Sequence, residues 1–359
     1  MNPQSTSMTS MSHPTSLPSD KTDTSLPLLS VVIPIHNGAR WVGETLDSIF
    51  QQSFQDFELI LVDDASSDDL RAALQLHPDP RLRVIHLHQN LGVAGARNHG
   101  VALARGHYIG FCDADDLCLL DRFQHQIDYL EQHPEISVCG SGFTCFDTED
   151  RETVSHPGTP DAIRLALMRG NCFGMSTMMG RAALFRAHPF DQDMSPTEDF
   201  DLWARLAAQG EGMANLPQSL LRYRVHAQQA SQVKSARLDQ LARRIRSRYC
   251  AQLLGNASLL RSIQHGELTL ADLDVAQQAI ASYCLAHPDF SPEAFRFLLA
   301  WMYQQLPDHG WSSWWHWHGV QQGLGLSLDR NYRLNLFVLA FLPRGLRSKY
   351  FETLIKLKR

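Results

Sequence analysis

Three carboxylates stand within four residues of this chain, at Asp113, Asp115 and Asp116, directly after the apolar run Tyr108–Phe111. Such a run is typical of a buried strand, so we expect the acids where that strand leaves its sheet. Grouped carboxylates repel one another unless a cation or a donor group compensates their charge. A divalent cation that also holds substrate phosphates would compensate it. The alternative is that Asp115 or Asp116 caps a helix beginning near Leu119.

Polar side chains also follow two earlier apolar runs, Leu29–Ile35 and Phe57–Val62. In a parallel sheet the carboxyl ends of the strands lie at one edge, and ligands bind there. Polar groups after all three runs therefore favour a binding site over three unrelated helix caps. The residues concerned at the first two strand ends are Pro34, His36, Asn37, Asp63 and Asp64.

The elements that must position these residues alternate between strand and helix patterns over residues 28 to about 131. This alternation predicts an α/β fold with a parallel, doubly wound sheet. Beyond it, Ile136–Cys145 is strand-like, Gly170–Gly180 is irregular and Phe200–Ala208 is helical, and from Ala236 onward the pattern is helical. The predicted elements of the first part are strands at Leu29–Ile35, Phe57–Val62, Leu82–Leu87 and Tyr108–Phe111, and helices around Trp41–Phe50, Ser66–Leu76 and Val93–Ala104.

The bulk properties exclude several classes of protein. A net charge of −6 over 359 residues argues against a general nucleic-acid binder. Seven cysteines without a CxxC pair indicate a reducing, cytoplasmic protein, and the scattered histidines do not predict a zinc site. Residues 1–27 lack the apolar core of a signal peptide and are expected to be a disordered leader. The longest apolar candidate near the C-terminus, Leu334–Leu342, is too short to span a membrane.

The C-terminal third suggests a contact with an anionic membrane surface. From Arg330 onward the chain carries eight Arg or Lys residues and one acid, Glu352. Apolar residues at helical spacing between these cations predict a basic amphipathic tail from Arg344 onward. The Trp-rich stretch Trp311–His318 is of the kind found at lipid–water interfaces. The alternative is that the tryptophans pack among helices and the charges point into solvent.

Six motifs, in order, resemble those of family 2 glycosyltransferases, which have the GT-A fold. The resemblance implies a Rossmann-like, doubly wound mixed sheet in residues 28–234, followed by a mainly helical region over 235–359. One departure is His36, where the family usually has Tyr. The motifs are Ser30–Gly38, Leu61–Ser66, Asn90–Asn98, Asp113–Asp116, Thr197–Arg205 and Tyr223–Ser231.

The same resemblance implies inverting transfer of a sugar from a nucleotide donor to an acceptor hydroxyl. Asp63 would accept the imide N–H of uracil or thymine, which favours UDP- or dTDP-sugars. Arg97 would bring a permanent charge to the pyrophosphate or ribose, and the alternative is an ion pair with neighbouring acids. His226 would bind the diphosphate or the metal, or would be a surface residue. The nucleotide-sugar site would comprise Pro34, His36, Asn37, Asp63, Arg97, Asp113 and His226.

Asp115 would bind a divalent metal, Mn or Mg, with help from Asp113, and the metal would neutralise charge on the departing diphosphate. The resemblance makes Asp199 the catalytic base, with Glu198 beside it as the second acid of the pair. Asp116 would support the metal site or cap a helix.

We therefore expect a metal-dependent hexosyltransferase of bacterial cell-surface polysaccharide synthesis, with a lipid-linked or polysaccharide acceptor. It would be cytoplasmic or peripheral on the inner face of the plasma membrane. The alternative is an inactive nucleotide-sugar-binding partner subunit. A dinucleotide-dependent oxidoreductase is excluded because no GxGxxG follows the first strand, where the chain has Ile35–Gly38 instead.

Overall fold

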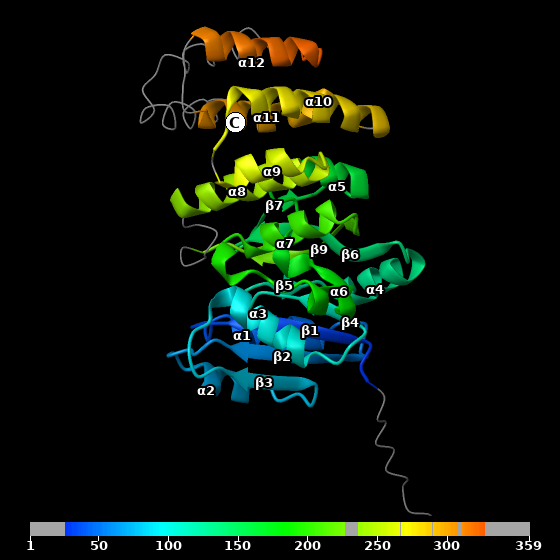
Figure 1. Ribbon diagram of the computed structural model, residues 1–359. Helices are drawn as coiled ribbons and strands as arrows, with labels where there is room; N and C mark the ends of the chain where they lie inside the picture. The colour runs from blue at the N-terminus through cyan, green and yellow to red at the C-terminus, as the bar shows by residue number, and fades with distance from the viewer. Residues whose placement is uncertain (1–25, 227–235, 266, 289, 307–310, 327–359) are drawn as a thin grey trace, which may run out of the picture.

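The computed structural model describes residues 26–226, 236–265, 267–288, 290–306 and 311–326. The expected leader, apart from its last two residues, and the expected basic tail lie outside the described residues. The described chain forms a nine-stranded sheet followed by a stack of helices (Figure 1).

The strand order is β3-β2-β1-β4-β8-β6-β9-β5, with β7 paired to β6. The first four strands in this order are parallel, as the alternating pattern predicts. Beyond β4 the sheet is mixed, because β8 runs antiparallel to both β4 and β6, which confirms the mixed sheet that the family resemblance implies. The strands are β1 Leu29–Ile35, β2 Phe57–Asp63, β3 Leu82–His86, β4 Tyr108–Phe111, β5 Leu117–Cys118, β6 Ile136–Phe146, β7 Asp150–Val154, β8 Met179–Arg181 and β9 Gly212–Arg224.

Helices cover both faces of the sheet, because successive residues of a strand point to opposite faces. Val31 and Ile33 of β1 lie in the core that α1 and α4 cover. Val32 lies in the opposite core, with residues of α3 and α7. Both faces are apolar, so β1 and β2 are buried along their whole length. The helices of this part are α1 Val42–Phe50, α2 Leu70–Gln75, α3 Gly92–Leu103, α4 Arg122–Gln132, α5 Pro160–Leu167, α6 Ala182–Ala187 and α7 Glu198–Ala208, with 3₁₀ turns η1 Met175–Thr177 and η2 Gln192–Met194.

The C-terminal helices stack on one side of the sheet region, ending with α12 at the far end (Figure 1). One apolar core runs from β1 through α7 to these helices, without a break. The buried carboxylate of Asp201 connects the sheet region with the C-terminal helices. This side chain of α7 accepts hydrogen bonds from Arg205 at 2.8 Å and from Arg248 of α8 at 2.5 Å. The helices are α8 Ala236–Leu253, α9 Ala257–His265, α10 Leu270–Ala286, α11 Arg296–Gln305 and α12 Trp311–Gly323, with a 3₁₀ turn η4 at Pro292–Phe295.

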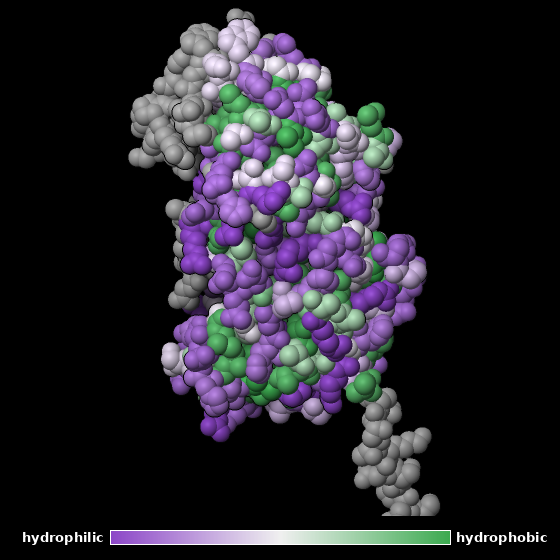
Figure 2. All heavy atoms as spheres, viewed as in Figure 1, coloured by the Kyte–Doolittle hydropathy of each residue, from purple (hydrophilic) through white to green (hydrophobic). Residues whose placement is uncertain are grey.

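The Trp-rich stretch forms α12, and its tryptophans have different surroundings. Trp317 is buried, and its indole N–H donates to the carbonyl of Leu299 at 3.2 Å. Trp315 is 58% exposed. On the face seen in Figure 2 apolar groups are interspersed with polar ones over the helices. Among the described helices none is long and apolar enough to cross a membrane.

Candidate active site at the carboxyl edge of the sheet

The acidic segment Asp113–Asp116 leaves the carboxyl end of β4 and leads into β5. Helix α4 begins only at Arg122, after Asp121. Asp115 and Asp116 therefore do not cap a helix, and that alternative is excluded. We call residues 113–116 the acid loop.

Asp113 belongs to a chain of ion pairs that reaches the far side of the site. A buried guanidinium, Arg97 of α3, donates to Asp113 Oδ1 at 2.9 Å and to Glu198 Oε1 at 2.8 Å. Arg97 therefore forms ion pairs with neighbouring acids, which is the alternative role that the sequence analysis left open. It connects the acid loop with the first turn of α7, although the two segments are far apart in the sequence.

Asp115 contacts His226, which lies two residues after β9. Its Oδ2 lies 2.9 Å from Nε2 of His226, and the His226 ring stacks on Trp41 with the ring centroids 5.6 Å apart. Burial and the charge of Asp113 raise the pKa of Asp115, although His226 lowers it. A raised carboxyl pKa means that the ionised form lacks full compensation.

Asp116 is fully buried and binds the backbone of β9. Its Oδ1 accepts a hydrogen bond from the amide of Arg224 at 2.9 Å. Burial, with the charges of Asp115 and Asp113, raises the pKa of Asp116 well above its usual range. The Arg224 side chain donates to the Asp115 carbonyl at 2.8 Å and to Glu44 at 2.7 Å. Asp116 and Arg224 therefore attach the acid loop to β9.

Asp199 lies beside Glu198 in the first turn of α7. Its Oδ2 accepts a hydrogen bond from Asn171 at 2.7 Å, and its Oδ1 accepts one from the amide of Phe200 at 2.6 Å. Burial and the neighbouring Glu198 raise the pKa of Asp199 to about 6, although Arg97 lowers it. A carboxyl group with this pKa is ionised at neutral pH and can still accept a proton, which suits a general base.

Asp63 ends β2 and is held ionised by its neighbours. The amide of Ser66 donates to Oδ1 at 2.9 Å, and His86 at the end of β3 lies 2.8 Å from Oδ2. Burial alone would raise the pKa of Asp63, but these hydrogen bonds outweigh it and the pKa is lowered. Each carboxylate oxygen has a second lone pair, so Asp63 can still accept a ligand N–H.

The residues after β1 lie at the same edge. Pro34 is buried in β1, whereas His36 and Asn37 are exposed. Asn37 has a φ of 54°, a left-handed conformation that Asn tolerates, and its Oδ1 accepts from the amide of Ser67 at 2.8 Å. Residues from the ends of β1, β2 and β4 thus share one edge of the sheet, as the sequence predicts.

The metal donors at this edge are few. Within the described residues no group of three or more His, Cys, Asp or Glu side chains is arranged to hold a metal ion. Asp115 and His226 do lie in contact, and Asp113 of the same loop is near enough for its charge to act on Asp115, although Asp113 itself is paired with Arg97. Their chemistry matches a hard divalent cation that takes its remaining oxygens from a substrate.

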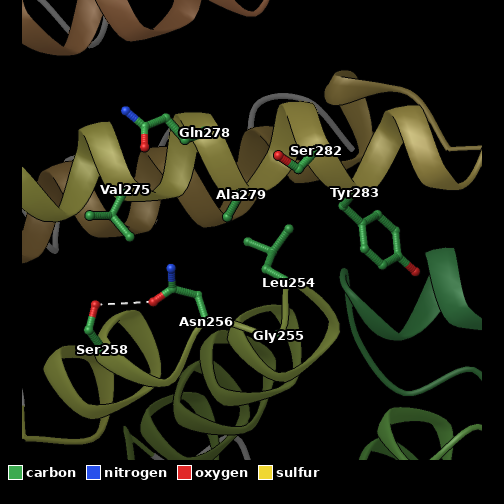
Figure 3. Close-up of a pocket in the computed structure, with 9 residues that line it drawn as sticks. All are labelled: Leu254, Gly255, Asn256, Ser258, Val275, Gln278, Ala279, Ser282 and Tyr283. Carbon is green, nitrogen blue, oxygen red and sulfur yellow. Dashed lines mark hydrogen bonds between the residues drawn. The ribbon is translucent and has the colours of Figure 1, made fainter.

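A separate hollow of about 540 Å³ lies among the C-terminal helices, between α10 and the turn that joins α8 to α9 (Figure 3). Val275, Ala279 and Tyr283 of α10 face Leu254 and Asn256 across it. Its lining contains no carboxylate, so it does not offer the acid–base chemistry of the sheet edge.

Sequence reasoning missed three residues of the site. Asn171 lies in the stretch interpreted only as irregular, and His86 was noted only as one of the scattered histidines. Trp41 is predicted only as the first residue of the helical pattern that follows the first strand. Arg40 and Arg224 place their guanidinium carbons 4.2 Å and 4.4 Å from the centre of its ring. The feature of the sequence that could have identified Trp41 as a site residue is its position just after the end of the first strand.

Known proteins resemble this chain in sequence and in structure. Residues 30–193 match the model of Glycosyl transferase family 2. EpsE of Bacillus subtilis (strain 168) is 35% identical over 205 residues, which cover 55% of this chain and 73% of EpsE. The amylovoran biosynthesis glycosyltransferase AmsE of Erwinia amylovora is 29% identical over 206 residues, which cover 55% of this chain and 76% of AmsE. The structure of S. aureus TarS 1-349 in complex with UDP-GlcNAc has a TM-score of 0.55 at 17% identity, covering 89% of this chain and 91% of that one. This last likeness concerns the fold, which is GT-A.

Proposed function

Because the chain belongs to glycosyltransferase family 2, we propose that it transfers a sugar from a nucleotide donor to an acceptor hydroxyl with inversion at the anomeric carbon. The observation that carries this proposal is the chain of contacts Asp113–Arg97–Glu198, which brings the acid loop next to Asp199. A donor-binding loop and a general base beside each other are what a single-displacement transfer requires.

The proposed donor is a UDP- or dTDP-sugar. Asp63 is an ionised acceptor at the carboxyl end of β2, and the imide N–H of uracil or thymine is a matching donor. Adenine has no such imide. The structural neighbour TarS has been solved with UDP and with UDP-GlcNAc, which supports a uridine nucleotide here. Pro34, His36 and Asn37 would line the same nucleotide site.

Asp115 and Asp113 would hold the proposed Mn or Mg ion, and His226 is close enough to Asp115 to join them. The raised pKa of Asp115 fits this assignment, because a cation would compensate the charge that the protein leaves uncompensated. When bound, the metal would neutralise charge on the departing diphosphate. Arg97 adds a fixed positive charge behind Asp113.

Asp199 would act as the base. It would take the proton of the acceptor hydroxyl while that oxygen forms a bond to the anomeric carbon, from the face opposite the diphosphate. The bond from the anomeric carbon to the diphosphate oxygen breaks, and its electron pair leaves with the nucleotide. Glu198 stays paired with Arg97 and keeps Asp199 basic through its negative charge.

The proposed setting is bacterial cell-surface polysaccharide synthesis on a lipid-linked or polysaccharide acceptor. AmsE and TuaG, which match this chain, are named for the biosynthesis of amylovoran and of teichuronic acid. Such a role is compatible with a cytoplasmic enzyme peripheral to the inner face of the plasma membrane. The second candidate, an inactive nucleotide-sugar-binding subunit, would keep the donor site and lack turnover, but Asp115 and Asp199 are both present.

Calorimetric titration of UDP, with and without Mn²⁺, tests the donor site. We expect metal-dependent binding by the unaltered protein and its loss in Asp115→Ala. Asp128→Ala, which removes an exposed aspartate of α4, is the matched control and should bind as the unaltered protein does. Absence of UDP binding in both conditions would refute the uridine assignment. Equal binding by Asp115→Ala would refute the metal assignment.

A further inference from the structure

The segment Asn171–Thr177 touches both halves of the active site. At one end, Asn171 Nδ2 donates to Asp199 Oδ2 at 2.7 Å. At the other end, the buried Ser176 Oγ accepts a hydrogen bond from the amide of Asp113 at 2.9 Å. The two contacts are five residues apart in the chain, and they reach the base and the acid loop respectively.

We propose that Asn171 and Ser176 are positioning residues, and that the segment between them sets the base and the donor-binding loop relative to each other. Asn171 orients Asp199 and favours its ionised form. Ser176 orients the backbone where the acid loop begins. This inference rests on the proposed function for the roles of Asp199 and the acid loop, and neither positioning residue belongs to the motifs that carry the family resemblance.

Buried amide side chains anchor the backbone of this segment near both of its ends. Asn215 of β9 donates to the carbonyl of Cys172 at 3.3 Å. Gln126 of α4 donates to the carbonyl of Thr177 at 2.7 Å. Within the segment, Thr177 Oγ1 donates to the carbonyl of Gly174 at 2.7 Å. A segment held in this way can position other groups, because its own conformation is already determined.

The orientation of the Asn171 amide follows from its second hydrogen bond. Its Oδ1 accepts from the amide of Phe173 at 3.2 Å, so the NH₂ group points to Asp199. A hydrogen bond donated to a carboxylate stabilises the ionised form. The charged groups near Asp199 are Glu198, which opposes ionisation, and Arg97, which favours it. Asn171 adds a neutral donor to this balance.

The first experiment measures the titration of Asp199 directly. Protein labelled with ¹³C at the aspartate carboxyl is titrated by NMR, and the Asp199 signal is assigned by its loss in Asp199→Asn. We expect Asn171→Ala to raise the pKa of Asp199 by about one unit, since a hydrogen bond to a charged group contributes this order of free energy. Asn171→Asp, which adds a like charge, should raise it further.

Asn256→Ala is the matched control, because Asn256 also accepts a backbone amide hydrogen bond, from Leu259 at 2.9 Å, but lies in the helical region. It should leave the titration of Asp199 unchanged. An unchanged pKa in Asn171→Ala would overturn the role of Asn171. So would an equal shift in the control, because the effect would then reflect general destabilisation.

The second experiment concerns Ser176 and uses UDP with Mn²⁺ as the probe. We expect Ser176→Ala to weaken UDP binding about tenfold, whereas Asn171→Ala binds UDP as tightly as the unaltered protein. Ser247→Ala is the control, because it also removes a buried serine hydroxyl, one that donates to the carbonyl of Arg243 at 2.9 Å in α8. Unchanged UDP affinity in Ser176→Ala would overturn the role of Ser176.

The two experiments separate this inference from the proposed function. If the unaltered protein binds no UDP, the donor assignment fails and the Ser176 role fails with it. The NMR titration needs no substrate, so it still decides whether Asn171 controls the ionisation of Asp199.

Discussion

At Asp199 two acids lie side by side in the first turn of a helix, and only one of them has a guanidinium partner. Glu198 is paired with Arg97, whereas Asp199 receives neutral donors from Asn171 and from the Phe200 amide. Burial and the adjacent charge therefore raise the pKa of Asp199 to about 6. The same local arrangement makes this carboxylate basic and costs the folded state stability at neutral pH.

We predict that Asp199→Asn lowers the rate of sugar transfer by about 10²- to 10⁴-fold while UDP affinity is kept. In the unaltered enzyme the rate should fall as the pH drops below about 6, because the base must be ionised to accept a proton. Rates of release of the nucleoside diphosphate, UDP or dTDP, from a panel of UDP- and dTDP-sugars between pH 5 and pH 8 would check both statements. Asp161→Asn, in the first turn of α5, is the matched control.

The stability of the same variant gives an independent check. The folded-state pKa of Asp199 lies above that of a free aspartate, so folding binds a proton between the two values and stability falls as the pH rises through that window. At pH 7 Asp199→Asn should therefore be more stable by about 1–2 kcal/mol, measured by urea unfolding. A loss of stability together with the loss of activity would instead point to a structural role.

At the residue scale, the sequence was sufficient where a motif and a strand end coincide. The places of the acid loop and Asp63 at the sheet edge were predicted in this way, whereas Asp199 was predicted from the family motif at the start of a helix, and its role stays a prediction. Asn171 was not predicted, because its role depends on a contact 28 residues away, between an irregular segment and a helix start. No periodicity in the sequence reports such a contact.

At the scale of elements, α3 must lie very close to β1 and β2 to bring Arg97 to the acid loop. A Cβ added at Gly100 of α3 would be 2.5 Å from a methyl group of Val32 and 3.3 Å from one of Val62. Those two valines are fully buried in the sheet and have little room to move. The glycine therefore sets the distance between helix and sheet.

We predict that Gly100→Ala destabilises the protein by about 1–3 kcal/mol through overpacking. It should also weaken UDP binding, because α3 carries Arg97. Gly319→Ala is the control: Gly319 lies in helix α12 with no described atom within 4 Å of the added Cβ, and alanine favours a helix. Urea unfolding and calorimetry would measure the two effects, and a Gly100→Ala protein as stable as the control would contradict the close packing.

The sheet shows what the sequence could predict of the elements. The parallel half was predicted because its strands are continuous apolar runs separated by helical periods. The long strand β9 was missed: Pro217 and two polar neighbours interrupt its apolar pattern, and its pairing with β6 contains register shifts. Strand β8 has only three residues, and a segment so short has no recognisable period.

At the scale of the whole molecule, the helical region shares its apolar core with the sheet and is attached through the Asp201–Arg248 pair. The position of the boundary near residue 234 remains a prediction. Of the tryptophans that suggested a lipid interface, Trp317 belongs to this core and Trp315 is exposed. Trp315 is therefore available for membrane contact, whereas Trp317 is not, and the basic tail lies outside the described residues.

We predict that the full chain sediments with vesicles rich in phosphatidylglycerol and does not sediment with phosphatidylcholine vesicles. Binding should weaken as salt rises, because attraction between the basic tail and anionic lipid is screened. Removal of residues 344–359 should abolish it, and Trp315→Ala should reduce it. Equal sedimentation with both lipids, or none with either, would contradict a peripheral location on an anionic leaflet.

The attachment of the acid loop to β9 has a consequence for the chain during its synthesis. Asp116 accepts its hydrogen bond from the Arg224 amide, and the short strand β5 after the loop pairs with residues 221 and 222. A ribosome-bound chain that ends before residue 224 would contain the motifs from the first strand through Asp199. It would lack the Arg224 amide, which binds Asp116 of the acid loop. The growing polypeptide should therefore acquire affinity for a nucleotide late and abruptly, when β9 leaves the exit tunnel.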